Sequence, residues 1–593
     1  MTEILSVDNM RKSDAATIEG GISGKELMYK AGKAIYEAVE WKAPVGIVCG
    51  VGNNAGDGYV LARLLSDAGI DCTLILLEDR FSEDGRYYFD KCRDESSINY
   101  ISYESGYSGI SEASMLTDKE NCGLPEKKAR IEIEYIEKLE TLSKFKTLVD
   151  CIFGTGYRGE VRGKAREAIE KINVAGAYIV SVDINSGLNG DSGMCGEMVL
   201  KAGLDAVNSE KNTDKSYGKK ICVKSDITIS IGSFKPGHFL NMAKDVMKRK
   251  INCDIGIRPI QKPYYLIEEK DIKPFFFERP NFSNKGTYGY TAIIGGSKKY
   301  SGAVRLAAMA NAATQKQNVS ELAYLANAAM RSGAGVVKVG IPNSLYHDLL
   351  PLILESTIFP LSDNDGEFVF NEEEINELTK NVKTVAFGMG IGQSDETGKC
   401  LEYLLKNYSG TLIVDADGLN MLSKMDRELI RRAKGKLVLT PHIKEFERLS
   451  GLSKEEILSS PIKHAEGFAL DTGTILLLKG PSTIVTDGVR TYIVDAGCSG
   501  MATAGSGDVL SGILSAVCSY LPGINQRDSS VIDFNQRDVS VVNLIEAVAA
   551  GAYINGKAGE LAQKKYGSIS MIAGDTVACI PEVIKKLSCN TLV

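Results

Sequence analysis

The sequence lacks the features that mark nucleic-acid-binding, membrane-spanning and disulfide-stabilised proteins. Acidic residues outnumber basic ones by 76 to 69, whereas nucleic-acid phosphates are contacted mainly by Lys and Arg. No stretch is long and apolar enough to span a bilayer, and the opening MTEILSVDNMRKSDAATIEGG lacks the apolar run of a secretory signal. The 13 cysteines are odd in number and form no closely spaced metal-ligand pair. We therefore expect a cytoplasmic protein that binds neither nucleic acid nor a membrane.

What the sequence does contain is a repeated alternation of short apolar runs with helical stretches. The runs in the first half are VGIVCGVGNN, DCTLILLED, TLVDCIFGTG and AYIVSVDINSG, and each ends in a glycine-rich or acidic turn. Such Val/Ile-rich runs are typical of strands buried on both faces of a parallel sheet. Because 593 residues are too many for one ordinary core, we expect two α/β domains. We place them at residues 1–248 and 274–593, with residues 249–273, which contain several prolines, as the linker.

Two stretches have the character of additions to these domains. Residues 100–146 are rich in Glu and Lys, which predicts a solvated helix with flanking loops. The string NQRDSSV at Asn525 is followed by NQRDVSV at Asn535, a duplication that we interpret as a loop insertion.

A glycine-rich turn, CGVGNNAGDG (Cys49–Gly58), follows one apolar run and precedes the helical stretch YVLARLLSDAG. Its backbone amides and the helix amino terminus can bind an anion, although the string could also serve only as a tight connection. Asp150, Asp183 and Ser186 end two further runs, and ligands of parallel sheets bind at such strand ends. Asn54, Asp150 and Ser186 would supply oxygen ligands for a monovalent cation, and an Asp in the same pocket could act as an acid or base.

With DAATIEGGISGKELMYKAGKAI, these strings resemble the amino-terminal domain of the NAD(P)H-hydrate epimerase family over roughly 240 residues. The resemblance implies a Rossmann-like three-layer α/β sandwich, potassium held by Asn54, Asp150 and Ser186, and Asp183 as a catalytic residue. It also implies that the hydrated nucleotide contacts Asn53, Asn54, Ala55, Gly56, Asp57, Gly154, Thr155, Gly156, Tyr157, Arg158, Gly159, Glu160 and Asp183. Two positions depart from the family pattern, in that Ala55 stands where glycine is usual and Asn185 where proline is usual.

A second glycine-rich string, GMATAGSGDVLSG (Gly500–Gly512), places Asp508 at the start of an apolar helix. The turn and helix amino terminus can stabilise phosphoryl charge while a carboxylate takes a hydroxyl proton, although Asp508 could also act only as a helix cap. The string resembles the anion-hole and base motif of the ribokinase superfamily. The strings KGTYGYTAIIGGS, RSGAGVVKVGIP, FGMGIGQ, LIVDADGLN, LTPHIKEFERL and LLLKGPSTIVTDG are similar to those of ADP- or ATP-dependent NAD(P)H-hydrate dehydratases.

The second resemblance implies a ribokinase-like α/β domain in which Asp508 is the catalytic base. The hydrated substrate would contact Gly335, Gly390, His442 and Asp508. ADP or ATP, with a magnesium ion, would be held by Lys479, Gly480, Pro481, Ser482, Thr483, Ser499, Gly500, Met501, Ala502, Thr503, Ala504, Gly505, Ser506 and Gly507. His442 could instead be a packed or capping residue, and Asp415 and Asp417 could be strand-end caps or help to hold magnesium through water. Ile443 and Lys444 stand where the family usually has Pro-Gly, which leaves the shape of this loop open.

Together the resemblances imply a bifunctional repair enzyme and a homo-oligomer. It would epimerise the R and S hydrates of NADH and NADPH (NADHX and NADPHX), and then dehydrate the S hydrate by phosphorylating its ring hydroxyl and eliminating phosphate. Two other functions stay open: a ribokinase-like pyrimidine or thiazole kinase, and a non-enzymatic scaffold of the kind found in messenger-RNA decapping. The acidic balance, Asp150 and Asp183 disfavour the scaffold.

Overall fold

The computed structural model describes residues 1–95, 129–138, 140–196, 221–276, 279–298, 321–520 and 543–588. The chain divides into two compact units. The amino-terminal unit contains Ile4–His238 and Met242–Pro263, and the carboxy-terminal unit contains Met1–Glu3, Phe239–Asn241 and Tyr264–Val593. In the part of the chain that the structure describes, no helix has both the length and the apolar character needed to cross a bilayer.

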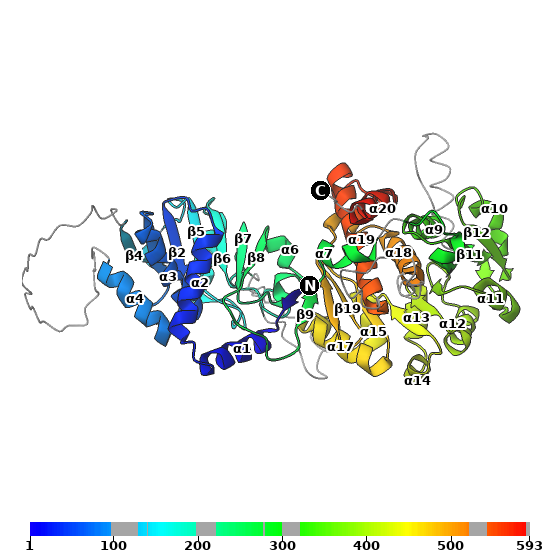
Figure 1. Ribbon diagram of the computed structural model, residues 1–593, viewed down its shortest axis with the longest axis horizontal. Helices are drawn as coiled ribbons and strands as arrows, with labels where there is room; N and C mark the ends of the chain where they lie inside the picture. Colours follow the sequence, from blue (N-terminus) through cyan, green and yellow to red (C-terminus); the bar gives the residue numbers. More distant parts are fainter. Residues whose placement is uncertain are drawn as a thin grey trace, which may run out of the picture. The chain divides into compact units, whose positions relative to one another are not determined.

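The amino-terminal unit is built on a parallel sheet of seven described strands in the order β4-β3-β2-β5-β6-β7-β8 (Figure 1). The strands are β2 (Val45–Cys49), β3 (Cys72–Leu76), β4 (Ile131–Tyr135), β5 (Thr147–Cys151), β6 (Tyr178–Val182), β7 (Ile227–Ile231) and β8 (Lys250–Cys253). The helices are α1 (Val7–Glu19), α2 (Gly24–Ala38), α3 (Asn53–Asp67), α4 (Glu83–Glu95), α5 (Gly163–Val174) and α6 (Ala243–Val246). The order reverses after β2, because β3 lies on one side of it and β5 on the other, and such a reversal opens a crevice at the carboxyl ends of the strands.

Both faces of this sheet are covered, which explains why its strands read as continuous apolar runs. Along β2, Ile47 packs into a core that includes residues of α2 and α3, while Val48 packs into a separate core that includes residues of α5. All five residues of β2 are buried. The predicted three-layer α/β sandwich is therefore confirmed.

The carboxy-terminal unit contains a sheet of eleven described strands in the order β1-β9-β20-β19-β18-β17-β16-β15-β10-β11-β12. They are β1 (Thr2–Ile4), β9 (Tyr264–Leu266), β10 (Tyr290–Ile294), β11 (Val336–Pro342), β12 (Thr357–Leu361), β15 (Thr384–Phe387), β16 (Thr411–Val414), β17 (Lys436–Leu439), β18 (Ile475–Leu478), β19 (Thr483–Thr486) and β20 (Thr491–Val494). The seven strands from β18 to β12 in this order are parallel, whereas β19 is antiparallel to both of its neighbours. A two-stranded hairpin, β13 (Asp363–Asn364) and β14 (Glu367–Phe368), stands apart from this sheet.

The longer helices of this unit are α9 (Glu321–Arg331), α11 (Glu372–Thr379), α12 (Asp395–Asn407), α15 (Ile443–Ser450), α17 (Pro461–Thr472), α18 (Ser506–Tyr520), α19 (Leu544–Tyr566) and α20 (Ala573–Ser588). The shorter ones are α7 (Glu269–Ile272), α10 (Tyr346–Leu349), α13 (Asp417–Leu422), α14 (Arg427–Arg431) and α16 (Lys454–Ser459). Helix α18 packs closely on α9, because a Cβ at Gly512 would lie 2.3 Å from the carbonyl oxygen of Leu325. The predicted second α/β domain is confirmed.

The structure differs from the sequence-based expectations at three places. The predicted linker, residues 249–273, contains β8, which extends the first sheet, and β9, which belongs to the second. Strand β1 also joins the second sheet beside β9, where the amino group of Met1 pairs with Asp271 at 2.9 Å. The helix predicted over residues 100–146 is wrong for the end of that range, since Ile131–Tyr135 forms edge strand β4 with Ile131 buried. Residues 96–128 and both NQRD strings lie outside the described residues.

Candidate functional site

A cavity of about 620 Å³ lies at the carboxyl ends of the first sheet's strands, where the strand order reverses. Its walls include Val51–Asn54 after β2, Ile152–Tyr157 after β5, and Asp183 after β6. Helices α1 and α2 close another side with apolar side chains, among them Met10 and Met28. The cavity therefore collects most of the residues that the first glycine-rich turn and its partner strings predicted.

Within the predicted nucleotide segments, some residues line the cavity and others do not. The turn at Asn53 is already the first turn of α3, so Asn53, Asn54 and Asp57 face the cavity while Ala55 and Gly56 are buried beneath them. The segment Gly154–Tyr157 lines the cavity, whereas Arg158, Gly159 and Glu160 continue beyond it. The cap residue Gly52 has no side chain to accept a hydrogen bond, so the amino terminus of α3 presents backbone N–H groups to this space.

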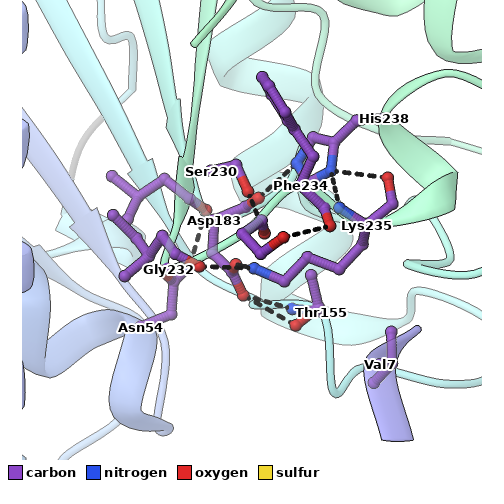
Figure 2. A network of polar contacts seen from close by, with 12 residues as sticks. Val7, Asn54, Thr155, Asp183, Ser230, Gly232, Phe234, Lys235 and His238 are labelled. Carbon is purple, nitrogen blue, oxygen red and sulfur yellow. Dashed lines mark hydrogen bonds and ion pairs between the residues drawn. The ribbon is translucent and has the colours of Figure 1, made fainter. Parts of the chain in front are cut away.

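Asp183 is the centre of a polar network shown in Figure 2. Its Oδ2 accepts hydrogen bonds from the Thr155 backbone N–H at 2.8 Å and hydroxyl at 2.9 Å. Its Oδ1 lies 2.6 Å from the Lys235 ammonium, whose side chain is 1% exposed and also donates to the Ile231 carbonyl at 2.9 Å. Asp183 has a left-handed backbone, with φ of 62°, which L-residues rarely adopt and which tends to occur at functional sites.

His238 supports the same network from behind. Its Nδ1 accepts a hydrogen bond from the Lys235 backbone N–H at 3.0 Å, so Nε2 carries the proton and donates to the Asp183 carbonyl at 2.7 Å. Burial, with the charge of Lys235, lowers the pKa of His238 to about 4, so the ring is neutral near pH 7. His238 therefore fixes the backbone on both sides of the ion pair without adding charge.

The aspartates of this cavity differ in their protonation. Burial alone would raise the pKa of Asp183, but the charge and hydrogen bond of Lys235 and the bonds from Thr155 bring it below its ordinary value. Burial, with the charges of Asp183 and Asp14, raises the pKa of Asp57 well above its ordinary value. Burial likewise raises the pKa of Asp14 to about 6, against the opposing charge of Lys235. The cavity thus combines a carboxylate whose pKa is lowered, a carboxyl group whose pKa is raised by burial, and a third carboxyl group with a pKa of about 6.

The three predicted potassium ligands lie around the ends of β5 and β6. Asp150 is fully buried and accepts hydrogen bonds from the Ser186 hydroxyl at 2.5 Å, the Ser186 N–H at 2.9 Å and the Ser181 hydroxyl at 2.9 Å. Burial raises its pKa, which these hydrogen bonds only partly oppose. The side chain of Asn54 donates to the Val182 carbonyl at 3.3 Å, while its buried Oδ1 has no hydrogen-bond partner among the described residues. A buried carboxylate and an unsatisfied amide oxygen are the kind of donors that a hard monovalent cation takes.

Asn185, the departure from the family's usual proline, is a fully buried hub beside this set. Its amide donates to the carbonyls of Val223 at 2.9 Å and Val246 at 3.0 Å. Its Oδ1 accepts from the Thr228 hydroxyl at 2.5 Å. The substitution therefore ties the turn after β6 to neighbouring segments by hydrogen bonds and leaves Asp183 and Ser186 in place.

A second polar cluster lies at the carboxyl ends of the second sheet's parallel strands. Asp415 follows β16 and accepts hydrogen bonds from Lys479, after β18, at 2.9 Å and from the Ser511 hydroxyl of α18 at 2.7 Å. Glu445 lies 3.9 Å from the same ammonium. Burial alone would lower the pKa of Lys479, but the charges of Asp415, Glu445 and Asp508 raise it. Lys479 is thus held charged beside the first turn of α18.

Asp508 lies in that first turn, at the end of the loop predicted to bind the adenine nucleotide. Gly505 has a φ of 84°, so it supplies the left-handed residue that precedes the helix. The buried hydroxyl of Ser506 has no hydrogen-bond partner among the described residues. Upstream, the Gly500 N–H donates to Gln563 of α19 at 2.9 Å, which anchors the loop from outside. In the other predicted segment, the Ser482 hydroxyl is buried and lies 2.7 Å from Asp495, so it points into the protein.

The predicted substrate contacts of this unit are not all brought together. His442 and Gly390 follow β17 and β15, next to Asp415. Gly335, however, precedes β11, which is parallel to β10, so it lies at the opposite edge of the sheet. A Cβ at Gly335 would lie 1.8 Å from the Lys285 carbonyl oxygen, so close packing of the backbone explains why this position is glycine.

His442 is the amino-terminal cap of α15. Its Nδ1 accepts hydrogen bonds from the N–H groups of Lys444 at 3.1 Å and Glu445 at 3.3 Å. In turn, the His442 N–H donates to the Glu445 carboxylate at 2.8 Å. Burial, followed by the charge of Lys479, lowers its pKa. Ile443 and Lys444 therefore start a capped helix, and the side chain of His442 stays 50% exposed.

Several residues of both sites were not predicted from the sequence. Lys235 and Asp14 line the first cavity, and His238 supports Asp183 from outside it. Glu445 and Ser511 belong to the second cluster. Asp14 begins the string DAATIEGG, and Lys235 follows the glycine turn after β7, but neither position carries a distinctive spacing. Asp417 acts as a clamp, because it accepts from the Gly392 N–H and the Gln393 amide, each at 3.0 Å.

Segments of both units match known protein families. Residues 24–237 match the family model described as YjeF-related protein N-terminus, and residues 322–582 match that described as NAD(P)H-hydrate dehydratase. The bifunctional NAD(P)H-hydrate repair enzyme Nnr of Thermofilum pendens is 29% identical over 581 residues, covering 96% of this chain and 93% of that protein. That of Escherichia coli is 26% identical over 590 residues, covering 97% and 93%. The ADP/ATP-dependent NAD(P)H-hydrate dehydratase of Bacillus subtilis, co-crystallised with ATP/Mg2+, is 21% identical with a TM-score of 0.43, covering 55% of this chain and 99% of that structure. The chain belongs to the family of bifunctional NAD(P)H-hydrate repair enzymes.

Proposed function

We propose that the chain converts the hydrates of NADH and NADPH back to the intact dinucleotides, with a different step in each unit. The observation that carries the proposal is the pairing, in each unit separately, of a glycine-rich helix amino terminus with buried carboxylates at strand ends. The first feature suits the phosphates of a nucleotide, and the second suits proton transfer. The amino-terminal unit epimerises the hydrate, and the carboxy-terminal unit removes water from the S form.

In the amino-terminal unit, the hydrated nucleotide occupies the cavity of about 620 Å³. The amino terminus of α3, with Asn53 and Asn54, meets the nucleotide phosphate, and the segment Gly154–Tyr157 wraps the hydrated nucleotide. Asp183, fixed by Lys235 and Thr155, contacts the ring. Epimers interconvert when the ring opens at the hydroxyl-bearing carbon and closes on the opposite face.

A potassium ion fits beside this cavity. Asn54 Oδ1, Asp150 and Ser186 would hold it, and the orphaned Oδ1 together with the buried Asp150 carboxylate supports that assignment. When bound, the ion would neutralise the buried carboxylate near the phosphate-binding turn. No cluster of three or more His, Cys, Asp or Glu side chains suited to a metal occurs among the described residues, and a potassium site built from amide, hydroxyl and carboxylate oxygens needs none.

In the carboxy-terminal unit, Asp508 takes the proton of the ring hydroxyl as its oxygen attacks the terminal phosphoryl group of ADP or ATP. The nucleotide is held by the loop Ser499–Gly507 and by Lys479, which its acidic neighbours keep charged. Magnesium supplies additional neutralisation of phosphate charge when bound. The ring nitrogen lone pair then expels phosphate, and a carbon next to the former hydroxyl carbon loses a proton, which restores the ring double bond. His442 and Gly390 contact the hydrated ring.

The direct test is incubation of the full chain with mixed hydrate epimers, with and without ADP or ATP. We expect epimer exchange without nucleotide, seen by proton NMR, and recovery of NADH absorbance only with nucleotide. A stable phosphorylated product without NADH would instead identify a small-molecule kinase. The odd number of cysteines, 13, fits a reducing, cytoplasmic location, and light scattering would test the proposed homo-oligomer.

A further inference from the structure

The cavity of the amino-terminal unit contains a carboxylate to which neither the proposed function nor the matched family segment assigns a role. Asp14 lies on α1, upstream of the segment 24–237 that matches the family model, and it lines the cavity. The other charged side chains in the wall are Asp57 on α3, Asp84 on α4, Asp183 after β6 and Lys235 after β7. Four aspartates thus share the space with one lysine.

Asp183 is badly placed to accept a proton from a substrate. Its Oδ2 already accepts two hydrogen bonds from Thr155, and its Oδ1 is 2.6 Å from the Lys235 ammonium. These contacts hold the carboxylate ionised, as the lowered pKa of Asp183 reflects, and a weakly basic group is a poor general base. Asp183 is therefore suited to orient the substrate while another group moves the proton.

Asp14 and Asp57 have the opposite character. Neither carboxyl group makes a hydrogen bond or ion pair with another described residue. Both line the same cavity as Asp183 and Lys235, and the charges of that ion pair influence the pKa of each. Two carboxyl groups that line one cavity and are not engaged by other side chains can serve as proton acceptor and proton donor in a reversible ring opening.

We propose that Asp14 accepts the proton of the substrate hydroxyl during epimerisation and that Asp57 supplies a proton to the ring nitrogen. This inference rests on the proposed epimerase function. As the O–H proton passes to Asp14, a carbon–oxygen double bond forms, the carbon–nitrogen bond of the ring breaks, and the nitrogen takes the proton of Asp57. Rotation of the resulting aldehyde exposes its other face. Reclosure then reverses each transfer, so both residues return to their starting states and no oxidant or co-reactant is needed.

The two pKa shifts agree with this division of roles. Near pH 7 Asp14, with a pKa of about 6, is mostly ionised and can accept a proton, while the raised pKa of Asp57 favours the protonated form of that carboxyl group. Below pH 6 Asp14 becomes protonated, so the rate of epimerisation should fall as the pH falls. We assign this acid limb of the pH–rate profile to Asp14, because Lys235 holds Asp183 ionised.

The test compares the full-length wild type with Asp14→Asn, Asp14→Glu and the matched control Asp8→Asn. Asp8 lies on the same helix, pairs with Lys12 at 2.6 Å and does not line the cavity. Epimer exchange is measured by proton NMR between pH 5 and 8, with the uncatalysed rate subtracted, and kcat and KM are separated. Fluorescence of Trp41, which packs against the core of the amino-terminal unit, reports whether that unit is folded in each variant.

We expect Asp14→Asn to lower kcat for epimerisation about 100-fold or more, with little change in KM. The fall in rate below pH 6 should be absent from its pH–rate profile. Asp14→Glu should restore part of kcat together with the limb, and Asp8→Asn should match the wild type. An Asp14→Asn variant with near-normal kcat and an unchanged pH profile, or with an effect on KM alone, would overturn the assignment while leaving the epimerase function intact. Absence of exchange by the wild type itself would overturn both.

Discussion

Replacing Lys235 by methionine removes the ammonium that holds Asp183 while keeping much of the side-chain volume. Lys235 is among the largest fully buried side chains of the chain, at 1% exposure, and the side chain of Asp183 is only 17% exposed. After the substitution, Asp183 keeps its hydrogen bonds from Thr155 but has lost its counter-ion. We expect the amino-terminal unit to be destabilised by about 3–5 kcal/mol, the usual result of leaving one charge of a buried pair uncompensated.

The chain offers an unusually clean probe for this measurement. Its one tryptophan, Trp41, belongs to the amino-terminal unit, packs against that unit's core and donates to the Tyr36 carbonyl at 2.8 Å. Urea unfolding followed by Trp41 fluorescence therefore reports this unit within the intact chain. A loss of about 3–5 kcal/mol corresponds to a fall in the midpoint of about 1–2 M.

Lys248→Met is the matched control, because Lys248 pairs with Asp226 at the same 2.6 Å but is 80% exposed. Exposed pairs contribute little, so its midpoint should stay at the wild-type value. The double variant Lys235→Met/Asp183→Asn removes both charges and should be more stable than Lys235→Met alone.

The pH dependence gives an independent check. In the wild type the pKa of Asp183 is lowered, so its contribution is present above its ordinary value of 3.8 and is lost as the pH falls below that. Without Lys235, burial dominates and raises the pKa of Asp183, so protonation relieves the penalty. The stability difference between wild type and Lys235→Met should thus shrink from pH 7 to pH 5. A difference below about 1 kcal/mol that is independent of pH would refute this view of the pair.

Three further predictions concern the chemistry of the two units. Asp508→Asn should abolish nucleotide-dependent recovery of NADH absorbance while epimer exchange by NMR continues, and near-normal recovery would contradict its role as the base. Asp150→Ala should lower epimer exchange sharply in potassium buffer, because the remaining ligands Asn54 and Ser186 offer only neutral oxygens. Dehydration of the S hydrate should be unchanged, since it takes place in the other unit. Equal exchange by the wild type in potassium and in a bulky organic-cation buffer would exclude the cation site. His442→Asn should preserve the cap of α15, since asparagine is also a good cap, but raise KM for the hydrate several-fold, and an unchanged KM would leave His442 with the capping role alone.

The location of both sites could be predicted because parallel sheets place the carboxyl ends of their strands at one edge. Each glycine-rich or acidic string directly follows a buried apolar run, so the sequence order of runs and turns is enough to bring Asp150 and Asp183 to one crevice. The same reasoning does not reach Gly335, which stands before a strand and not after it, so its predicted contact with the substrate depends on the family resemblance alone. A glycine in a familiar string is informative only together with the end of the strand to which it belongs.

The groups that complete the sites could not be predicted, because their role depends on contacts between distant segments. Lys235 lies 52 residues from Asp183 in sequence, and Asp14 reaches the cavity from a helix that precedes the whole sheet. Edge strand β4 was hidden for a different reason, since its alternating IEIEY pattern is charged on the outward face and reads as a solvated helix when only composition is considered.

The distribution of charge in the first cavity also indicates how the substrate lies in it. The walls contain four aspartates and one lysine, so the phosphates of a dinucleotide cannot be bound by side-chain cations there. The one feature that favours an anion is the amino terminus of α3, where the cap residue Gly52 leaves backbone N–H groups free of a side-chain acceptor. The hydrated ring, which carries no net charge, is the part of the substrate that tolerates these aspartates. An orientation with the phosphate at the backbone N–H groups of α3 and the uncharged ring beside the aspartates is therefore the one that this distribution of charge favours.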